Sequence, residues 1–234
     1  MATYVISDIH GHYDEFMQLL ERIDFKDEDT LYVLGDILDR GPHPIKTLFK
    51  LMEMPNAICM VGNHELMALD CFKFLTKEIT DESLSELDEE TIDNYLCWQS
   101  NGCEPTLAEY RALDPQKRQD VIDFIREFLI YEELTVSGKK FLLVHAGLGN
   151  YSPEKDIEDY SLKELVWDRA DYGVQYYPDV YVVTGHTPTQ YIEENPNPGR
   201  IFKSNNHIAI DCGCGIPRGC LGAICLDTLE EYYV

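Results

Sequence analysis

The sequence is poor in basic residues: its 234 residues include 19 Lys and Arg against 43 Asp and Glu, for a formal charge of -24. Without a basic excess to neutralise phosphates, we expect the chain to bind neither nucleic acid nor an anionic membrane surface. Basic peptides suit this charge as partners, although an acidic surface also serves solubility alone. The charge therefore limits the partners and leaves the chemistry open.

Long apolar runs are also missing, and none approaches the length that spans a membrane. The first residues, Met1 to Ile6, contain no basic segment, long apolar stretch or cleavage site of the kind found in secretion signals. We therefore expect a cytoplasmic protein.

Paired Cys-x-x-Cys knuckles are absent, although the chain has eight cysteines. Four of them lie close together near the C-terminus: Cys212, Cys214, Cys220 and Cys225. Their spacing is not typical of a structural zinc site. A chain of this length with 44% hydrophobic residues needs no disulfide framework to support its core. We expect reduced thiols that are buried or inert, and the role of the C-terminal group stays open.

What the sequence does contain is a repeated pattern of strand, polar loop and helix. Apolar runs at Thr3–Ser7, Thr30–Leu34 and Ala57–Val61 predict strands, and helical patterns follow the first two. Further strands are expected at 131–136, 140–144, 180–184, 207–210 and 223–226. This rhythm predicts an α/β core with a largely parallel sheet.

An acidic, helical stretch interrupts this rhythm from about Leu66 to Phe128. We interpret it as a helical cap, roughly 66–130, inserted into a single domain over residues 1–234. The surface that selects the substrate is expected around Trp98, Asn101 and Gly102. Trp98 could stack on a nucleotide base, although a tryptophan on a helix more often packs in a core.

Five polar clusters follow predicted strands, and they carry four of the seven histidines: Asp8–Gly11, Gly35–Gly41, Gly62–Glu65, His145–Gly147 and Gly185–Pro188. The carboxyl ends of strands in an α/β sheet converge on one edge, so these clusters should meet there. Together they offer six oxygen and imidazole donors: Asp8, His10, Asp36, Asn63, His145 and His186. Such donors suit manganese, iron or zinc.

Two divalent ions about 3.5–4 Å apart can activate a water molecule and stabilise in-line attack on phosphorus. A shared site needs a carboxylate that bridges the ions, and Asp36 is the natural candidate. We expect His64, oriented by Asp39, to protonate the leaving oxygen. Arg40 offers a bidentate fork for the phosphoryl oxygens.

With these motifs in this order, the sequence resembles the phosphoprotein phosphatase family of metallophosphoesterases. It is similar in style to the small bacterial and bacteriophage lambda-type serine/threonine phosphatases. The resemblance extends from Thr3 to the C-terminal strands. It implies a calcineurin-like metallophosphoesterase domain, in which a central β-sandwich is flanked by helices. It also implies a dinuclear centre that is usually served by manganese.

The resemblance further assigns the donors to two metals, with Asp8 and His10 on one, Asn63, His145 and His186 on the other, and Asp36 bridging. Val166–Arg169 resembles the segment that carries a second phosphate-binding arginine, so Arg169 is the candidate. Asp211 begins a segment like the closing Asp-x-Gly turn of the family. Ser7 departs from the family, which has glycine there; it adds a small side chain beside the site and removes no ligand.

We therefore predict a metal-dependent phosphomonoester hydrolase, a serine/threonine protein phosphatase whose substrate is a phosphorylated protein, a phosphopeptide or a small phosphomonoester. The alternative is a symmetrical diadenosine tetraphosphate hydrolase, because the motif set resembles those enzymes too. The acidic insertion has few cations that could bind the additional phosphates of a tetraphosphate, and this favours the protein phosphatase. A catalytically inactive binding module is a further alternative, but every expected ligand position is filled. The native metal and the oligomeric state stay open.

Overall fold

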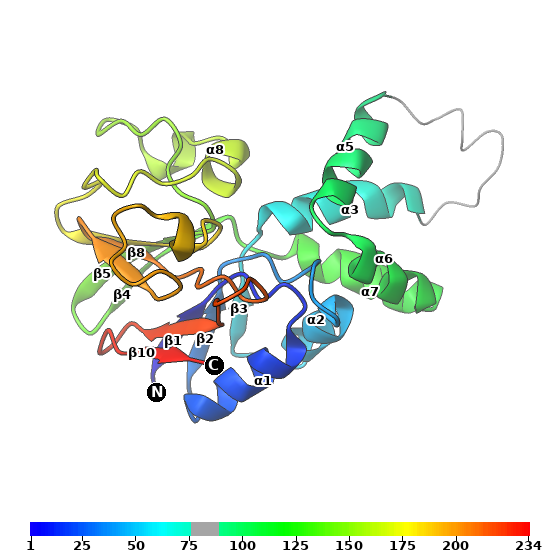
Figure 1. Ribbon diagram of the computed structural model, residues 1–234, viewed down its shortest axis with the longest axis horizontal. Coiled ribbons are helices and arrows are strands. Elements are labelled where there is room, and N and C mark those ends of the chain that lie inside the picture. Colours follow the sequence, from blue (N-terminus) through cyan, green and yellow to red (C-terminus); the bar gives the residue numbers. More distant parts are fainter. Residues whose placement is uncertain (76–88) are drawn as a thin grey trace.

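Two five-stranded sheets form the centre of the computed structural model, which describes residues 1–75 and 89–234 (Figure 1). The first sheet has the order β10-β9-β1-β2-β3 and contains β1 (Thr3–Ile6), β2 (Thr30–Val33), β3 (Ala57–Cys59), β9 (Gly222–Cys225) and β10 (Glu231–Tyr233). The second has the order β4-β5-β6-β8-β7 and contains β4 (Tyr131–Val136), β5 (Lys139–Val144), β6 (Val180–Thr184), β7 (Phe202–Ser204) and β8 (His207–Ala209).

The prediction of a largely parallel sheet is only partly right, because each sheet is mixed. Parallel pairing joins β1 to β2, β2 to β3, β5 to β6 and β6 to β8. The remaining pairs, β1–β9, β9–β10, β4–β5 and β7–β8, are antiparallel. Three of these four pairs are joined by short connections, which can close only antiparallel strands.

Alternation along the strands fixes how the sheets pack. Val5 on β1 faces a core shared with Phe141 and Leu143 on β5. Its neighbours Tyr4 and Ile6 face the opposite side of the first sheet, among the helices. Because successive side chains of a strand point to opposite faces, the two sheets stack into the predicted β-sandwich, with an apolar layer on each outer face.

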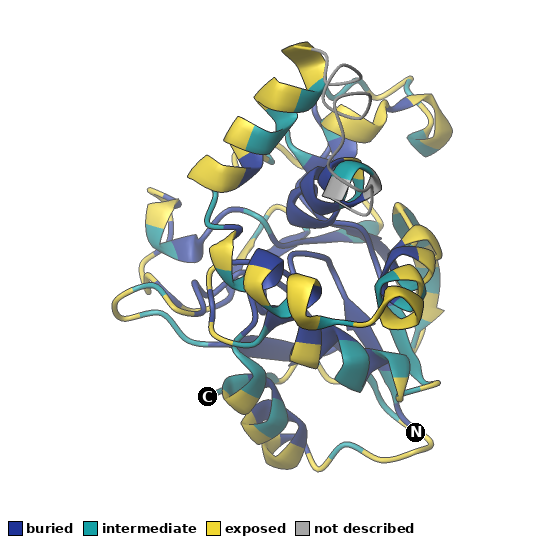
Figure 2. Ribbon diagram, turned by 90° about the vertical axis from the view of Figure 1, so that its right-hand side faces the viewer, coloured by how far each residue is buried: buried dark blue, intermediate teal, exposed yellow. Residues whose placement is uncertain are grey.

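Helices cover both outer faces. The helices α1 (Tyr13–Arg22) and α2 (Pro44–Met52) pack on the first sheet, and the short α8 (Leu162–Val166) packs on the second. Short 3₁₀ turns lie at Ile157–Asp159 and Thr189–Tyr191. Figure 2 shows buried strands at the centre and exposed residues on the outward sides of the helices.

The predicted insertion is helical where the structure describes it: α3 (Asn63–Leu75), α5 (Glu89–Ser100), α6 (Glu104–Ala112) and α7 (Pro115–Arg126). Residues 76–88 of that prediction lie outside the described part. Figure 1 shows these helices together on one side of the molecule. They join the core of the first sheet, where Phe72 stacks on Tyr110 with ring centroids 3.8 Å apart and meets Trp98 edge-on.

All eight cysteines are free in the structure, as expected for reduced thiols. Six are buried, whereas Cys97 is exposed and Cys220 is partly exposed. Within the described residues, the groups of side chains arranged to hold a metal contain no cysteine. In the same part of the chain, no helix combines the length and the apolar character needed to cross a bilayer.

Candidate active site

The predicted donors come together at the ends of the strands. Four of them lie in two groups of potential ligands, Asp36 with His145 and His186, and His10 with Asp36 and His64, the predicted proton donor; within each group the ligand atoms lie within 4.8 Å of one another, and Asp8 is in neither group. Asp36 follows β2, whereas the histidines of the second group follow β5 and β6 in the other sheet. Asp36 belongs to both groups, which is the arrangement required of a bridging carboxylate.

Much of the site has left-handed backbone. Six of the predicted site residues have φ between 46° and 70°: Asp8, His10, Asp36, Asp39, Arg40 and His186. This region is unfavourable for residues with a side chain, and such conformations gather at functional sites, where the surrounding structure imposes them. The backbone strain thus marks the same residues as the motifs do.

Backbone carbonyls orient two of the histidines. The Nδ1 of His10 lies 2.9 Å from the Leu38 carbonyl oxygen, and that of His145 lies 2.5 Å from the carbonyl oxygen of Leu34. Each Nε2 then faces Asp36, at 3.7 Å for His10 and 3.5 Å for His145. Burial lowers the pKa of both rings. They are therefore neutral at neutral pH, and each Nε2 keeps the lone pair that a metal needs, although that of His10 accepts a hydrogen bond from Arg40.

His186 and Asn63 complete the second group. The amide Oδ1 of Asn63 lies 3.1 Å from His145 Nε2 and 3.0 Å from His186 Nδ1. Burial lowers the pKa of His186 to about 4, so this imidazole is also neutral. The three side chains present nitrogen and oxygen donors to a common space.

The carboxylates of the site repel one another. Burial raises the pKa of Asp8 well above its usual range, and the charges of Asp211 and Asp36 raise it further. Burial likewise raises the pKa of Asp211 to about 7. Divalent cations would relieve this repulsion, and the set of carboxylate, amide and imidazole donors matches their chemistry. The residues present fit a two-metal centre.

His64 and Asp39 form the expected pair. His64 Nδ1 lies 2.6 Å from Asp39 Oδ2, and both side chains are completely buried. Burial alone would lower the pKa of His64, but the carboxylates of Asp36 and Asp39 raise it. The imidazole therefore holds a proton more readily than an isolated histidine, as a proton donor must.

Asp39 is held by the helical insertion. Trp98 Nε1 donates to Asp39 Oδ2 at 2.7 Å, and Thr106 Oγ1 donates to Oδ1 at 2.5 Å. Trp98 is fully buried, so it belongs to the core and is not placed to stack on a base. No sequence motif indicated a role for Thr106.

Arg40 lies over the first donor group. Its Nη1 is 2.7 Å from His10 Nε2 and its Nη2 is 2.9 Å from His64 Nε2. The backbone N–H of Arg40 donates to the Gly102 carbonyl at 2.9 Å, and its Nε lies 3.5 Å from the Asn101 carbonyl. Asn101 and Gly102, predicted to form a substrate surface, therefore contact the arginine itself.

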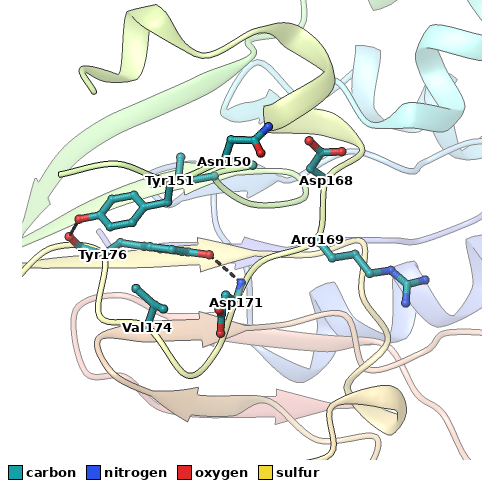
Figure 3. Close-up of a pocket in the computed structure, with 9 residues that line it drawn as sticks. Asn150, Tyr151, Asp168, Arg169, Asp171, Val174 and Tyr176 are labelled. Atoms are coloured by element: carbon teal, nitrogen blue, oxygen red, sulfur yellow. Dashed lines mark hydrogen bonds between the residues drawn. The ribbon is translucent and has the colours of Figure 1, made fainter. Parts of the chain in front are cut away.

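Arg169 is exposed and lies at the edge of the site. Its charge contributes to lowering the pKa of His186, after burial and His145. It lines a hollow of about 410 Å³ together with Tyr151 and Tyr176, and Figure 3 shows its guanidinium directed away from these two rings. Arg169 is thus near the second donor group and is not packed into it.

Glu65 is a site residue whose role the sequence reasoning missed. Its buried carboxylate accepts backbone hydrogen bonds from Asp36 at 2.8 Å, Ile37 at 2.9 Å, Leu38 at 3.1 Å and Gly62 at 2.9 Å. These contacts fix the loop that carries Asp36. The signal was present, because Glu65 ends the Gly62–Glu65 motif.

Ser7 stands where the phosphoprotein phosphatase family has glycine, and it does not disturb the donors. Its buried hydroxyl hydrogen-bonds to Asp8 Oδ2. The backbone of Gly185 lies against Ser7, and a Cβ at Gly185 would collide with that hydroxyl. The extra side chain is accommodated because residue 185 is glycine.

This fold and this site define a metallophosphoesterase. The family model for calcineurin-like phosphoesterases matches residues 1–206, and the chain belongs to that family.

Among curated proteins, the chain resembles symmetrical bis(5'-nucleosyl)-tetraphosphatases. That of Salmonella paratyphi C (strain RKS4594) is 31% identical over 161 residues, which cover 68% of this chain and 46% of the relative. That of Enterobacter sp. (strain 638) is 27% identical over 236 residues, covering 99% of this chain and 72% of the relative. The chain thus spans less than half the length of the Salmonella relative.

Solved structures share the fold. A candidate diadenosine tetraphosphatase has a TM-score of 0.67 at 18% identity, over 99% of this chain and 92% of that one. A serine/threonine phosphatase from Saccharomyces cerevisiae has a TM-score of 0.56 at 14% identity, over 97% of this chain and 72% of the other. At these identities the likeness concerns the fold alone.

Proposed function

We propose that the chain hydrolyses dinucleoside tetraphosphates symmetrically, cutting a phosphoanhydride bond to give two nucleoside diphosphates. The reaction type rests on the two donor groups that share Asp36. The substrate class rests on the relatives, which bear this activity in their names. Because of these relatives, we favour the symmetrical diadenosine tetraphosphate hydrolase, the alternative in the sequence analysis, over the serine/threonine protein phosphatase.

The protein phosphatase reading keeps one specific observation in its favour. The formal charge of -24 suits basic phosphopeptides better than a highly charged tetraphosphate. Both readings use the same site, so the substrate alone distinguishes them.

In this proposal Asp8 and His10 would hold one divalent metal, manganese being the first candidate, and Asn63, His145 and His186 would hold a second. Asp36 would be shared by the two. When bound, the two ions supply an activated water and stabilise the charge that develops during in-line attack on phosphorus.

The other residues act on the substrate directly. Arg40 binds non-bridging phosphate oxygens through its guanidinium, and it already lies beside both His10 and His64. In the structure His64 Nε2 accepts a hydrogen bond from Arg40 Nη2, so Arg40 must turn to the phosphate before Nε2 can carry the proton that it donates to the leaving oxygen; Asp39 holds the ring through Nδ1. The raised pKa of His64 supports this role.

A tetraphosphate extends well beyond the reacting phosphorus. Arg169 is a cation at the edge of the site, near the second donor group. We assign it to a neighbouring phosphate. The hollow next to it, about 410 Å³, has the size of pockets that take small ligands. The carboxylates of Asp168 and Asp171 line it and can accept hydrogen bonds from ribose hydroxyls.

The test compares initial rates on diadenosine tetraphosphate and on a phosphothreonine peptide, each with manganese and with EDTA. Manganese-dependent release of two ADP, faster than phosphate release from the peptide, is the expected result. Faster dephosphorylation of the peptide would reinstate the protein phosphatase. Cleavage into ATP and AMP would contradict the symmetrical reaction.

A further inference from the structure

Two of the C-terminal cysteines lie side by side in an environment that the others lack. Cys214 and Cys225 are buried in the apolar core under the first sheet. Cys220 is partly exposed and packs against the core cluster that contains the buried Cys212, whose thiol hydrogen-bonds to it. The structure thus divides the four cysteines into two inert thiols and one adjacent pair.

The sulfur of Cys220 is in contact with a cation. Arg200 Nη1 lies 3.2 Å from Cys220 Sγ, and the guanidinium stacks over the ring of Tyr233 at 4.4 Å from its centroid. The thiol of Cys220 donates to the Gly199 carbonyl oxygen at 3.4 Å, a contact that favours the protonated form. A neighbouring guanidinium stabilises a thiolate, which is the reactive form of cysteine.

The direction of the pKa shift agrees with this geometry. A hydrogen bond from the Cys212 thiol and the charge of Arg200 lower the pKa of Cys220 to about 7, although partial burial opposes them. Burial instead raises the pKa of Cys214 far above its usual range. Cys220 therefore has a larger thiolate fraction at neutral pH than Cys214.

The backbone holds the pair together. The Cys220 N–H donates to the Cys212 carbonyl at 3.1 Å, and Gln190 Nε2 donates to the same carbonyl at 2.9 Å. Residues 213–219 form a short loop whose two ends, Cys212 and Cys220, are joined by this backbone hydrogen bond. The side chains of the two cysteines therefore start from neighbouring backbone positions. This placement favours a bond between the two sulfurs without a large rearrangement.

We propose that Cys220 and Cys212 form a peroxide-reactive pair. The Cys220 thiolate attacks hydrogen peroxide, the O–O bond breaks, and hydroxide leaves as water with a proton from solvent. The resulting sulfenic acid is attacked by the Cys212 sulfur; the S–O bond breaks and the hydroxyl leaves as water with the Cys212 proton. In sum, two thiols are oxidised to a disulfide and one peroxide is reduced to two water molecules.

The test treats the full chain, in EDTA, with a small molar excess of hydrogen peroxide, then alkylates remaining thiols and maps peptides by mass spectrometry. The Cys212–Cys220 disulfide should appear first, while Cys97 and Cys214 should remain thiols and be recovered in alkylated form. Exposure alone predicts the reverse order, because Cys97 is the exposed cysteine. Oxidation of Cys97 ahead of Cys220 would overturn the proposal.

Variants separate chemistry from folding. Cys212→Ser should halt the sequence at a sulfenic acid on Cys220 that dimedone traps. Arg200→Gln should slow oxidation about tenfold through loss of the thiolate, and Arg200→Lys should restore most of the rate. Cys214→Ser is the matched control and should react like the parent chain. Equal rates for Arg200→Gln and the parent, with unchanged melting temperatures, would refute the role of the guanidinium.

Discussion

Arg40 and Arg169 are both cations of the site, but they differ at the level of single atoms. Arg40 is tied to the backbone of Gly102 and lies against His10 and His64. Arg169 is exposed beside a hollow and acts on His186 through its charge. In the proposed function the first contacts the reacting phosphate, and the second a more distant one.

The change Arg169→Ala should therefore depend on the length of the substrate. We expect KM for diadenosine tetraphosphate to rise about tenfold or more, because a charge-assisted contact to a phosphate is lost. The rate on p-nitrophenyl phosphate, which has one phosphate, should change little. Steady-state kinetics on both substrates measure this difference. Equal losses on the two would place Arg169 at the reacting phosphate instead.

At the scale of secondary structure, the insertion supports the pair formed by His64 and Asp39. The helices α5 and α6 provide Trp98 and Thr106, and both donate to the buried carboxylate of Asp39. A buried carboxylate that loses a donor pays much of its desolvation cost without compensation. The helices thus contribute both to stability and to the orientation of His64.

The substitution Thr106→Val removes the donor to Asp39 Oδ1 and the acceptor of the Asp39 N–H, and it nearly preserves the shape of the side chain. We expect a loss of about 1–3 kcal/mol in the free energy of unfolding, together with a lower kcat because Asp39 is less firmly held. Urea denaturation and steady-state rates measure the two effects. The matched control is Thr189→Val, since the buried Thr189 hydroxyl has no hydrogen-bond partner within the described structure. Similar losses in both variants would contradict the assignment.

The sequence predicted most elements and the donor set. Polar clusters that follow apolar runs are a local pattern, and the carboxyl ends of strands converge on one edge of a sheet, so the two together locate the donors. It missed the short β7, β10 and α8, whose three to five residues carry too little periodicity. It also missed Thr106, because that hydroxyl acts on a residue 67 positions away. Contacts of this kind follow from packing of the insertion, which no local motif encodes.

For the whole molecule, buried histidines connect stability to pH. His207 is buried in the second sheet, with Nε2 3.0 Å from Thr184 Oγ1. Burial lowers the pKa of His207 to about 3. In the unfolded chain the value is about 6.5. The unfolded state therefore binds the proton first, and folding is destabilised as pH falls from about 6.5 towards 3.

Between pH 7 and pH 5, this single group should lower the free energy of unfolding by about 2 kcal/mol. The variant His207→Gln should lack that part of the pH dependence, whatever its stability at pH 7. Urea titrations of both proteins at the two pH values provide the comparison. Parallel pH profiles would show that His207 is protonated in the folded state as readily as in the unfolded one.

The central claim is that Asp36 joins two metal ions in one centre, and anomalous diffraction from crystals grown with manganese tests it most directly. We predict two anomalous peaks in each molecule, both within bonding distance of the Asp36 carboxylate, and their loss in Asp36→Asn together with nearly all activity. A single peak, or two peaks that persist in a fully active Asp36→Asn protein, would contradict the account.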